Sequence, residues 1–119
     1  GMVGIYLNQI NKNNEVLVKG KLNRFRDFIF IEDVIFIIRK CMGIKNKRYN
    51  LFNVCTSKKT YIKDLIGKIF KFKNKNPKIF VTNSTPGDQK GIYGNNQKII
   101  KFLKIKKMTS LIVGLKRTI

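Results

Sequence analysis

The residues best suited to chemistry in this 119-residue chain lie in the run NRFRDFIFIEDVI, from Asn23 to Ile35. Two arginines and an aspartate stand directly before an apolar stretch, and a Glu-Asp pair follows it. A guanidinium is permanently charged and can hold phosphate oxygens in a fork of two hydrogen bonds. We therefore expect this segment to place a cation beside a strand, in a position to hold a phosphorylated ligand.

Other familiar chemistries are missing from the sequence. There is no histidine, which removes the commonest general base, most zinc sites and the usual catalytic triads. Cys41 and Cys55 lack the Cys-x-x-Cys spacing, and we interpret them as buried free thiols of a cytoplasmic protein. No apolar run reaches the roughly 18 residues that a membrane span requires, so we expect no membrane partner. Gly1 before Met2 resembles the remnant of a cleaved tag and is left out of the functional interpretation.

The charge of the chain admits three interpretations. The formal net charge is +20, from 26 Lys and Arg against 6 Asp and Glu, and such an excess favours a polyanionic partner such as nucleic acid. Lysine, isoleucine and asparagine share AT-rich codons, however, so a genome of biased base composition would give the same excess of lysine. Those lysines would then form solvated surface and have no binding role. The charge could also focus a field on a small anionic ligand. We rank nucleic acid below surface background and do not expect it as the partner.

These residues must be positioned by an α/β domain. Hydrophobic periodicity predicts short strands with about five helices in a single domain over residues 1–119. We expect the first helix over Met2–Ile10, and the second from Glu32 or Asp33 to a stop at Gly43. The buried stripe of that second helix is predicted to be Val34, Ile37, Ile38 and Cys41.

The remaining elements follow the same reasoning. Thr60 is expected to cap a third helix, which ends in the lysine-rich stretch after Lys71 and buries Ile62, Leu65, Ile66 and Ile69. A fourth helix is capped by Asn95 or Asn96 and runs through Leu103. A fifth is capped by Thr109 or Ser110 and turns Leu111 and Leu115 inward. The predicted strands are Val16–Val18 (closed by Gly20), Phe28–Ile31, Arg48–Val54 and Lys78–Val81, with a loop over Asn83–Gly91.

Five segments, in order, resemble the C-terminal, substrate-binding part of NAD-dependent epimerases and dehydratases. These enzymes act on nucleotide sugars, UDP-glucose 4-epimerase among them, and belong to the extended short-chain dehydrogenase/reductases. The segments are RDFIFIEDV (Arg26–Val34), FNVCTSKKT (Phe52–Thr60), TPGDQ (Thr85–Gln89), GNNQKIIKFLK (Gly94–Lys104) and TSLIVGLKRTI (Thr109–Ile119). The resemblance implies the small C-terminal domain of that fold, without a complete dinucleotide-binding fold.

The resemblance also implies substrate-binding residues. Arg26 matches the arginine that reaches the pyrophosphate of the sugar nucleotide, although pairing with Asp27 or Asp33 stays open. Asp88 matches the aspartate that contacts the ribose, although it could simply form a turn after Gly87. Val18 and Lys19 match the backbone that brackets the base.

The chain departs from the family pattern at several positions. Thr85 stands where many epimerases have a second phosphate-binding arginine. Ser57 replaces a usual turn glycine, Gly94 replaces a small-residue-then-aspartate pattern, and the late Leu-Gly pair reads Leu103-Lys104. Either the subfamily differs, or the site has drifted.

Two signatures of the complete enzymes are absent from this sequence. There is no glycine-rich turn for NAD, and no tyrosine has a lysine four residues later. The resemblance thus implies a nucleotide-sugar-binding fragment or one chain of a two-chain enzyme, with no NAD held by this chain and no catalysis by it alone. A basic nucleic-acid-binding module and a folded non-functional remnant stay open as alternatives.

The same resemblance bears on partners. In the family, the strand that matches Arg48–Val54 joins the sheet of the cofactor domain. An unpaired apolar strand edge favours association. We therefore expect a homo-oligomer or a separate cofactor-domain chain as the partner, besides the nucleotide sugar.

Overall fold

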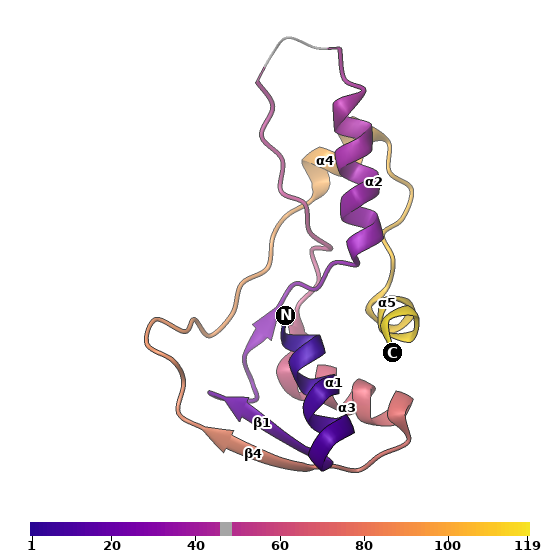
Figure 1. Cartoon of the computed structure of the whole chain (residues 1–119). Helices are drawn as coiled ribbons and strands as arrows, with labels where there is room; N and C mark the ends of the chain where they lie inside the picture. The colour runs from indigo at the N-terminus through magenta and orange to yellow at the C-terminus, as the bar shows by residue number, and fades with distance from the viewer. Residues whose placement is uncertain (46–48) are drawn as a thin grey trace.

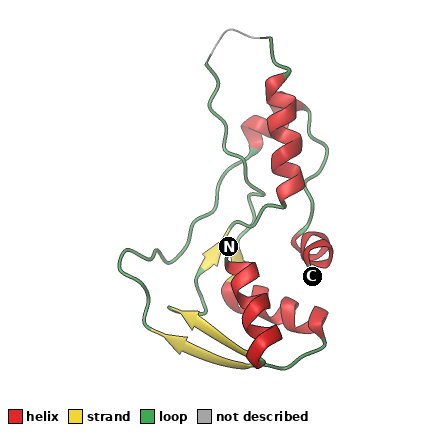
Figure 2. Ribbon diagram, viewed as in Figure 1, coloured by secondary structure: helices red, strands yellow, loops and turns green. Residues whose placement is uncertain are grey.

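The computed structural model describes residues 1–45 and 49–119, which form a mixed α/β fold (Figure 2). The elements in chain order are α1 (Met2–Asn13), β1 (Glu15–Lys19), β2 (Phe25–Arg26), α2 (Ile31–Met42), β3 (Thr60–Tyr61), α3 (Ile62–Lys73), β4 (Lys78–Thr82), α4 (Gln97–Leu103) and α5 (Leu111–Thr118). The predicted α/β class and the five helices are confirmed. No helix in the described ranges is long and apolar enough to cross a membrane.

The strands form two small sheets. β1 and β4 pair in parallel, in a register that runs from Glu15 opposite Lys78 to Lys19 opposite Thr82. A parallel pair needs a crossover connection, and α3 lies in that connection (Figure 1). β2 and β3 form a two-residue antiparallel ladder that ties the start of α3 to the arginine segment.

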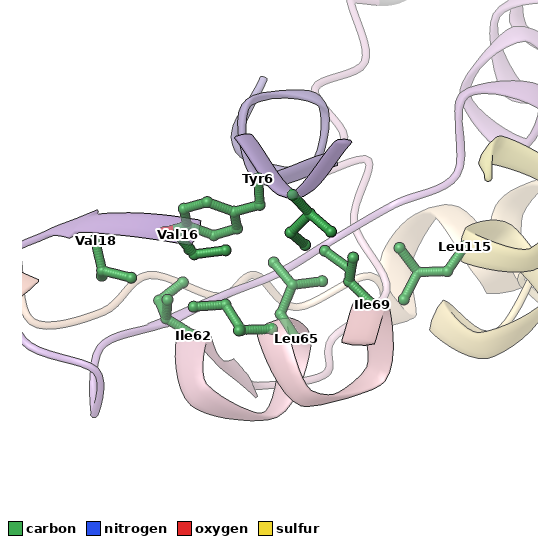
Figure 3. Packing of buried hydrophobic residues seen from close by; sticks show 9 residues of the cluster. Tyr6, Val16, Val18, Ile62, Leu65, Ile69 and Leu115 are labelled. Atoms are coloured by element: carbon green, nitrogen blue, oxygen red, sulfur yellow. The ribbon is translucent and has the colours of Figure 1, made fainter. Parts of the chain in front are cut away.

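The hydrophobic core lies where α1 and α3 pack against β1 (Figure 3). Alternation along β1 buries Val16 and Val18, because successive side chains of a strand point to opposite faces. All four residues predicted for the buried stripe of α3 are at most 1% exposed. Each such aliphatic side chain stabilises the fold by about 1.5–3 kcal/mol relative to an exposed one. The full cluster is Tyr6, Ile10, Val16, Val18, Ile62, Leu65, Ile66, Ile69 and Leu115.

The molecule is elongated. Its principal extents are 52 × 31 × 18 Å, with a radius of gyration of 16.7 Å, against roughly 13.5 Å for a compact domain of this length. α2 and α4 form an arm that extends away from the body built by α1, β1, α3 and β4 (Figure 1). Along α2, Ile37 is buried, but Ile38 is 52% exposed. The prediction that Ile38 joins the buried stripe is therefore wrong, and Val34 and Cys41 are only half-buried.

Two predicted strands are absent. Residues 27–30 are irregular and Ile31 already begins α2, so the strand predicted over Phe28–Ile31 is wrong. Residues 49–54 also form no strand, and Arg48, the first residue of the predicted Arg48–Val54, lies outside the described residues. A strand needs a neighbouring strand to pair with, and neither segment belongs to either of the two sheets in the described part of the chain.

Some helix ends follow the predictions, but α1 runs to Asn13 and does not end at Ile10, and α2 begins at Ile31 and not at Glu32 or Asp33. Gly43 closes α2, and Asn96 and Ser110 are the N-caps of α4 and α5. Ser110 accepts a hydrogen bond from the amide of Val113, at 3.4 Å. Thr60, predicted to cap α3, lies instead in β3, and Tyr61 is the N-cap. The antiparallel ladder with β2 draws Thr60 into strand geometry.

Candidate functional site

A cavity of about 530 Å³ lies between α1, β1 and the loop that follows β4. One wall is apolar and comes from the N-terminal half of α1 together with β1: Met2, Ile5, Tyr6 and Leu17. The other end is polar and charged: Lys19, Arg24, Arg26, Thr85 and Asp88. An apolar wall with a few convergent polar groups is the usual architecture of a small-molecule site.

β1 supplies two side chains to this cavity. Leu17 and Lys19 alternate with the buried Val16 and Val18, so they point to the opposite face of the strand. The amide of Leu17 donates a hydrogen bond to the side-chain oxygen of Gln9, at 3.1 Å, which joins the strand to α1. Val18 is 0% exposed, so its side chain belongs to the core, whereas Lys19 faces the cavity.

Arg26 is held at the charged end of the cavity. Its Nη2 donates to Asp88 Oδ1 at 2.8 Å, and its Nη1 donates to the backbone oxygens of Phe25 and Gln89 at 2.8 and 3.2 Å. The Arg26 side chain remains 24% exposed, against 9% for Asp88. The partner of Arg26 is thus Asp88, from the far end of the sequence, and neither Asp27 nor Asp33.

Arg24 is a charged residue of the site that sequence reasoning missed. It is only 8% exposed. Its guanidinium forms a salt bridge with Asp88 Oδ2 and donates to the backbone oxygens of Lys19 and Lys21, the latter at 3.0 Å from Nε. Asp88 therefore lies between two guanidinium groups, one on each carboxylate oxygen. Charge-assisted contacts of this kind are about twice as strong as neutral hydrogen bonds.

The backbone brings these groups together at two glycines. Gly20 ends β1 with a φ of +83°, and a Cβ there would lie 3.0 Å from Arg24 Cζ and 3.1 Å from Asp88 Oδ2. Only glycine combines that conformation with that approach. Residues 85–88 form a turn in which the Asp88 amide donates to the Thr85 carbonyl at 3.1 Å. Pro86 and Gly87 (φ +78°) have the types expected at the centre of a type II turn.

The acidic residues of the arginine segment have other roles. Asp27 accepts hydrogen bonds from the amides of Thr56 and Ser57, both at 2.9 Å, and from Gly94 at 3.4 Å. Asp33 accepts from the amide and hydroxyl of Thr109, at 2.7 and 2.8 Å. These carboxylates join the loop after α2 and the start of α5 to the arginine segment. They leave Asp88 as the carboxylate at the cavity.

Tyr6 contributes a titratable group to the apolar wall. Burial raises the pKa of its hydroxyl above the ordinary value of 10.0, and nearby Arg24 lowers it by a smaller amount. Tyr6 is therefore a neutral hydrogen-bonding group at physiological pH. Across the described ranges, no cluster of three or more His, Cys, Asp or Glu could hold a metal ion. The arrangement is thus suited to binding an anion with an apolar portion.

The chain shares its fold with solved nucleotide-sugar enzymes. UDP-glucuronic acid 4-epimerase from Bacillus cereus, in complex with UDP-glucuronic acid and NAD, aligns with a TM-score of 0.88 at 21% identity, over 98% of this chain. UDP-glucose 4-epimerase from Thermotoga maritima, with UDP-glucose, gives 0.88 at 22% identity over 98%. dTDP-glucose 4,6-dehydratase from Bacillus anthracis, with NAD, gives 0.88 at 13% over 99%. The expected resemblance in fold is confirmed.

The alignment covers only part of these enzymes. This chain spans 37% of the length of each of the three. No protein-family model matches its sequence, and no curated protein matches it. The likeness therefore concerns the fold, and the function rests on the cavity.

Proposed function

We propose that the chain binds a nucleotide sugar, with the diphosphate at the charged end of the cavity and the base against its apolar wall. The observation that carries this proposal is the exposed part of Arg26, which meets a cavity with an apolar wall on α1 and β1. The solved structures of the same fold include one with UDP-glucuronic acid and one with UDP-glucose. The ligand is accordingly a UDP-sugar or a dTDP-sugar.

The charges at the cavity suit a diphosphate. Arg24, Arg26 and Lys19 contribute three positive charges, and Asp88 contributes one negative charge. The net +2 complements the two negative charges of a nucleoside diphosphate ester. Arg26 grips the phosphate oxygens, and Lys19 adds a point charge at the end of β1.

Asp88 can serve the ligand while it holds both arginines. A carboxylate has about four acceptor positions, and the two salt bridges use one on each oxygen. Each oxygen can thus also accept a hydrogen bond from a ribose hydroxyl. Thr85, at the start of the same turn, lines the cavity as a neutral donor. Leu17 and Lys19 flank the base, and Val18 contributes only backbone.

The chain provides only part of the chemistry of the complete enzymes. β1 is followed by Gly20 and a loop into β2, whereas an NAD site needs a glycine-rich turn that opens a helix. The described residues therefore do not fit NAD. The proposal is a substrate-binding unit of an epimerase or dehydratase, inactive by itself. Cys41 and Cys55 are half-buried free thiols, so the prediction that they are buried is wrong; the cytoplasmic location is part of the proposal.

The proposal includes a protein partner. The exposed side of α2 carries an apolar row at helical spacing: Ile31, Ile35, Ile38 and Met42, each at least 48% exposed. Large contiguous apolar surfaces of this kind mark interaction sites. A second copy of the chain or a cofactor-binding chain covers this row.

The binding proposal is tested by titrating the chain with UDP-glucose and with dTDP-glucose and measuring the affinity of each by calorimetry. The wild type should bind, and Arg26→Ala should weaken the affinity about tenfold or more, because a charged hydrogen-bonding partner of the phosphates is lost. Arg117→Ala is the matched control: it also removes one arginine and one ion pair, that with Glu32 on the exposed surface. Equal losses in the two variants, or no binding by the wild type at millimolar ligand, would refute the proposal.

A further inference from the structure

A second cavity, of about 330 Å³, borders Arg24 and Asp88 and plays no part in the proposed nucleotide-sugar site. It is formed by the loop after β1 and the loop after β4. Every residue that lines it has a polar or charged side chain: Lys21, Asn23, Arg24, Ser84, Asp88 and Lys90. Arg24 and Asp88 border both cavities, so their salt bridge separates one from the other.

The charge of this cavity is strongly positive. Three of its lining residues are cationic, and its single carboxylate, Asp88, is neutralised by salt bridges to Arg24 and Arg26. Asp88 therefore repels an incoming anion little. Arg24 is nine-tenths buried, so its guanidinium is fixed in place before any ligand arrives, which reduces the ordering required on binding.

The hydrogen-bonding groups of this cavity are of the types that hold a phosphate. A guanidinium has five N–H donors, and three of the contacts of Arg24 go to Asp88, Lys19 and Lys21. Asn23 and Ser84 add an amide and a hydroxyl, and the ammonium groups of Lys21 and Lys90 add charge. No apolar side chain lines the cavity, in contrast to the first one.

We infer that this second cavity binds the phosphate group of a small molecule, either orthophosphate or a phosphomonoester. The volume exceeds what a phosphate group alone requires, so a small polar substituent on the phosphate can be accommodated. The inference stands on the lining of this cavity and does not require that the first cavity bind a nucleotide sugar.

Site-resolved NMR titration of the full chain with orthophosphate and with glucose 6-phosphate tests the inference. We expect saturable amide shifts at Lys21, Asn23, Ser84 and Lys90 with at least one of the two ligands. Tighter binding of glucose 6-phosphate would identify a phosphomonoester as the ligand, and equal affinities would mean that the phosphate group alone is recognised. Both results support the inference.

A pair of double variants separates this site from the general charge of the chain. Lys21→Met/Lys90→Met should weaken phosphate binding at least fivefold. Lys71→Met/Lys101→Met removes the same charge from α3 and α4, away from both cavities, and should leave the affinity unchanged. Equal weakening by both pairs, or shifts spread over all lysine-bearing helices, would show diffuse attraction by the +20 chain and overturn the inference.

The location of the shifts distinguishes the two cavities. Phosphate shifts confined to Ile5, Gln9 and Leu17 would place the anion in the first cavity and would also overturn the inference. Failure of UDP-glucose to bind, with phosphate shifts intact at Lys21 and Lys90, would count against the proposed function alone. Binding of single-stranded RNA that depends on Lys21 and Lys90, with no phosphate binding, would identify a nucleic-acid contact instead and overturn the inference.

Discussion

Arg24 and Arg26 are two residues apart, and both reach the carboxylate of Asp88. Two residues is the repeat of extended backbone, so their side chains leave the chain on the same side. That spacing was available in the sequence. The partner was not, because Asp88 lies more than 60 residues away and is brought in by the turn over residues 85–88. The difference in exposure also follows from the fold: Arg24 is buried and fixed by three contacts, whereas Arg26 is partly exposed.

The first prediction concerns Arg24. Arg24→Gln removes the salt bridge to Asp88. It also disrupts the hydrogen bonds that the guanidinium donates to the backbone oxygens of Lys19 and Lys21. We expect a loss of about 2–4 kcal/mol in the free energy of unfolding, measured by urea denaturation. Lys71→Gln, on the exposed side of α3, should cost less than about 0.5 kcal/mol. A loss for Arg24→Gln as small as that of the control would show that the cluster contributes nothing to stability.

The second prediction concerns Tyr6. Its pKa in the folded chain is raised by burial, so the unfolded chain gives up this proton at lower pH than the folded chain does. The contribution of Tyr6 to stability is then complete below pH 10 and is lost as pH rises through the folded pKa. Wild type and Tyr6→Phe, unfolded in urea at a series of pH values from 8 to 11, should show a steeper decline for the wild type. Parallel declines would contradict the assignment.

Among the helices and strands, hydrophobic periodicity predicted the buried helix positions better than apolar composition predicted the strands. The α3 stripe was predicted from spacing alone, because α3 packs on one side only. The alternation along β1, which the prediction did not use, accounts for its two core positions. The strands predicted over Phe28–Ile31 and Arg48–Val54 failed for a different reason. Apolar composition shows that burial of a segment is favourable. A strand also needs a second strand to pair with, and the sequence of the segment does not reveal whether that strand is present.

The candidate site was predictable to a similar degree. Arg26, Asp88, Lys19 and Thr85 were all named from the sequence, and all four line one cavity. Leu17 was missed in favour of Val18, although strict alternation with the buried Val16 would have identified it. Ile5 and Tyr6 on α1 gave no signal, because their role in the wall depends on how α1 lies across β1.

The third prediction tests the helix packing with two isoleucines that were both predicted from the sequence to be buried. Ile66 in α3 is 1% exposed, and Ile38 in α2 is 52% exposed. Ile66→Ala should destabilise the chain by about 2–5 kcal/mol, because it leaves a cavity in the core. Ile38→Ala should cost less than about 1 kcal/mol in the same thermal or urea unfolding measurement. Similar losses in both variants would mean that the exposed side of α2 is packed in solution.

Across the whole molecule, the extended shape and the exposed apolar row on α2 are the features that support the proposed protein partner. The net charge of +20 acts in the opposite direction, since it opposes close approach of two copies. The balance between the two should depend on ionic strength, because salt screens repulsion between exposed charges and leaves burial of apolar surface in place.

The fourth prediction is therefore salt-dependent association. Light scattering at micromolar concentration should show more dimer at 0.5 M than at 0.05 M salt. Ile35→Lys, which places a charge in the middle of the α2 row, should shift the chain toward monomer at both salt concentrations. A wild type that stays monomeric throughout would contradict self-association and leave a different chain as the partner on α2.

Nucleotide binding in the first cavity is best tested by locating UDP on the folded chain with intermolecular nuclear Overhauser effects. We expect contacts from the uracil ring to the methyl groups of Leu17 and Ile5, together with a saturable shift of the Arg26 side-chain resonances. Contacts to α2 or α4, or saturation that leaves Arg26 unchanged, would contradict this proposal.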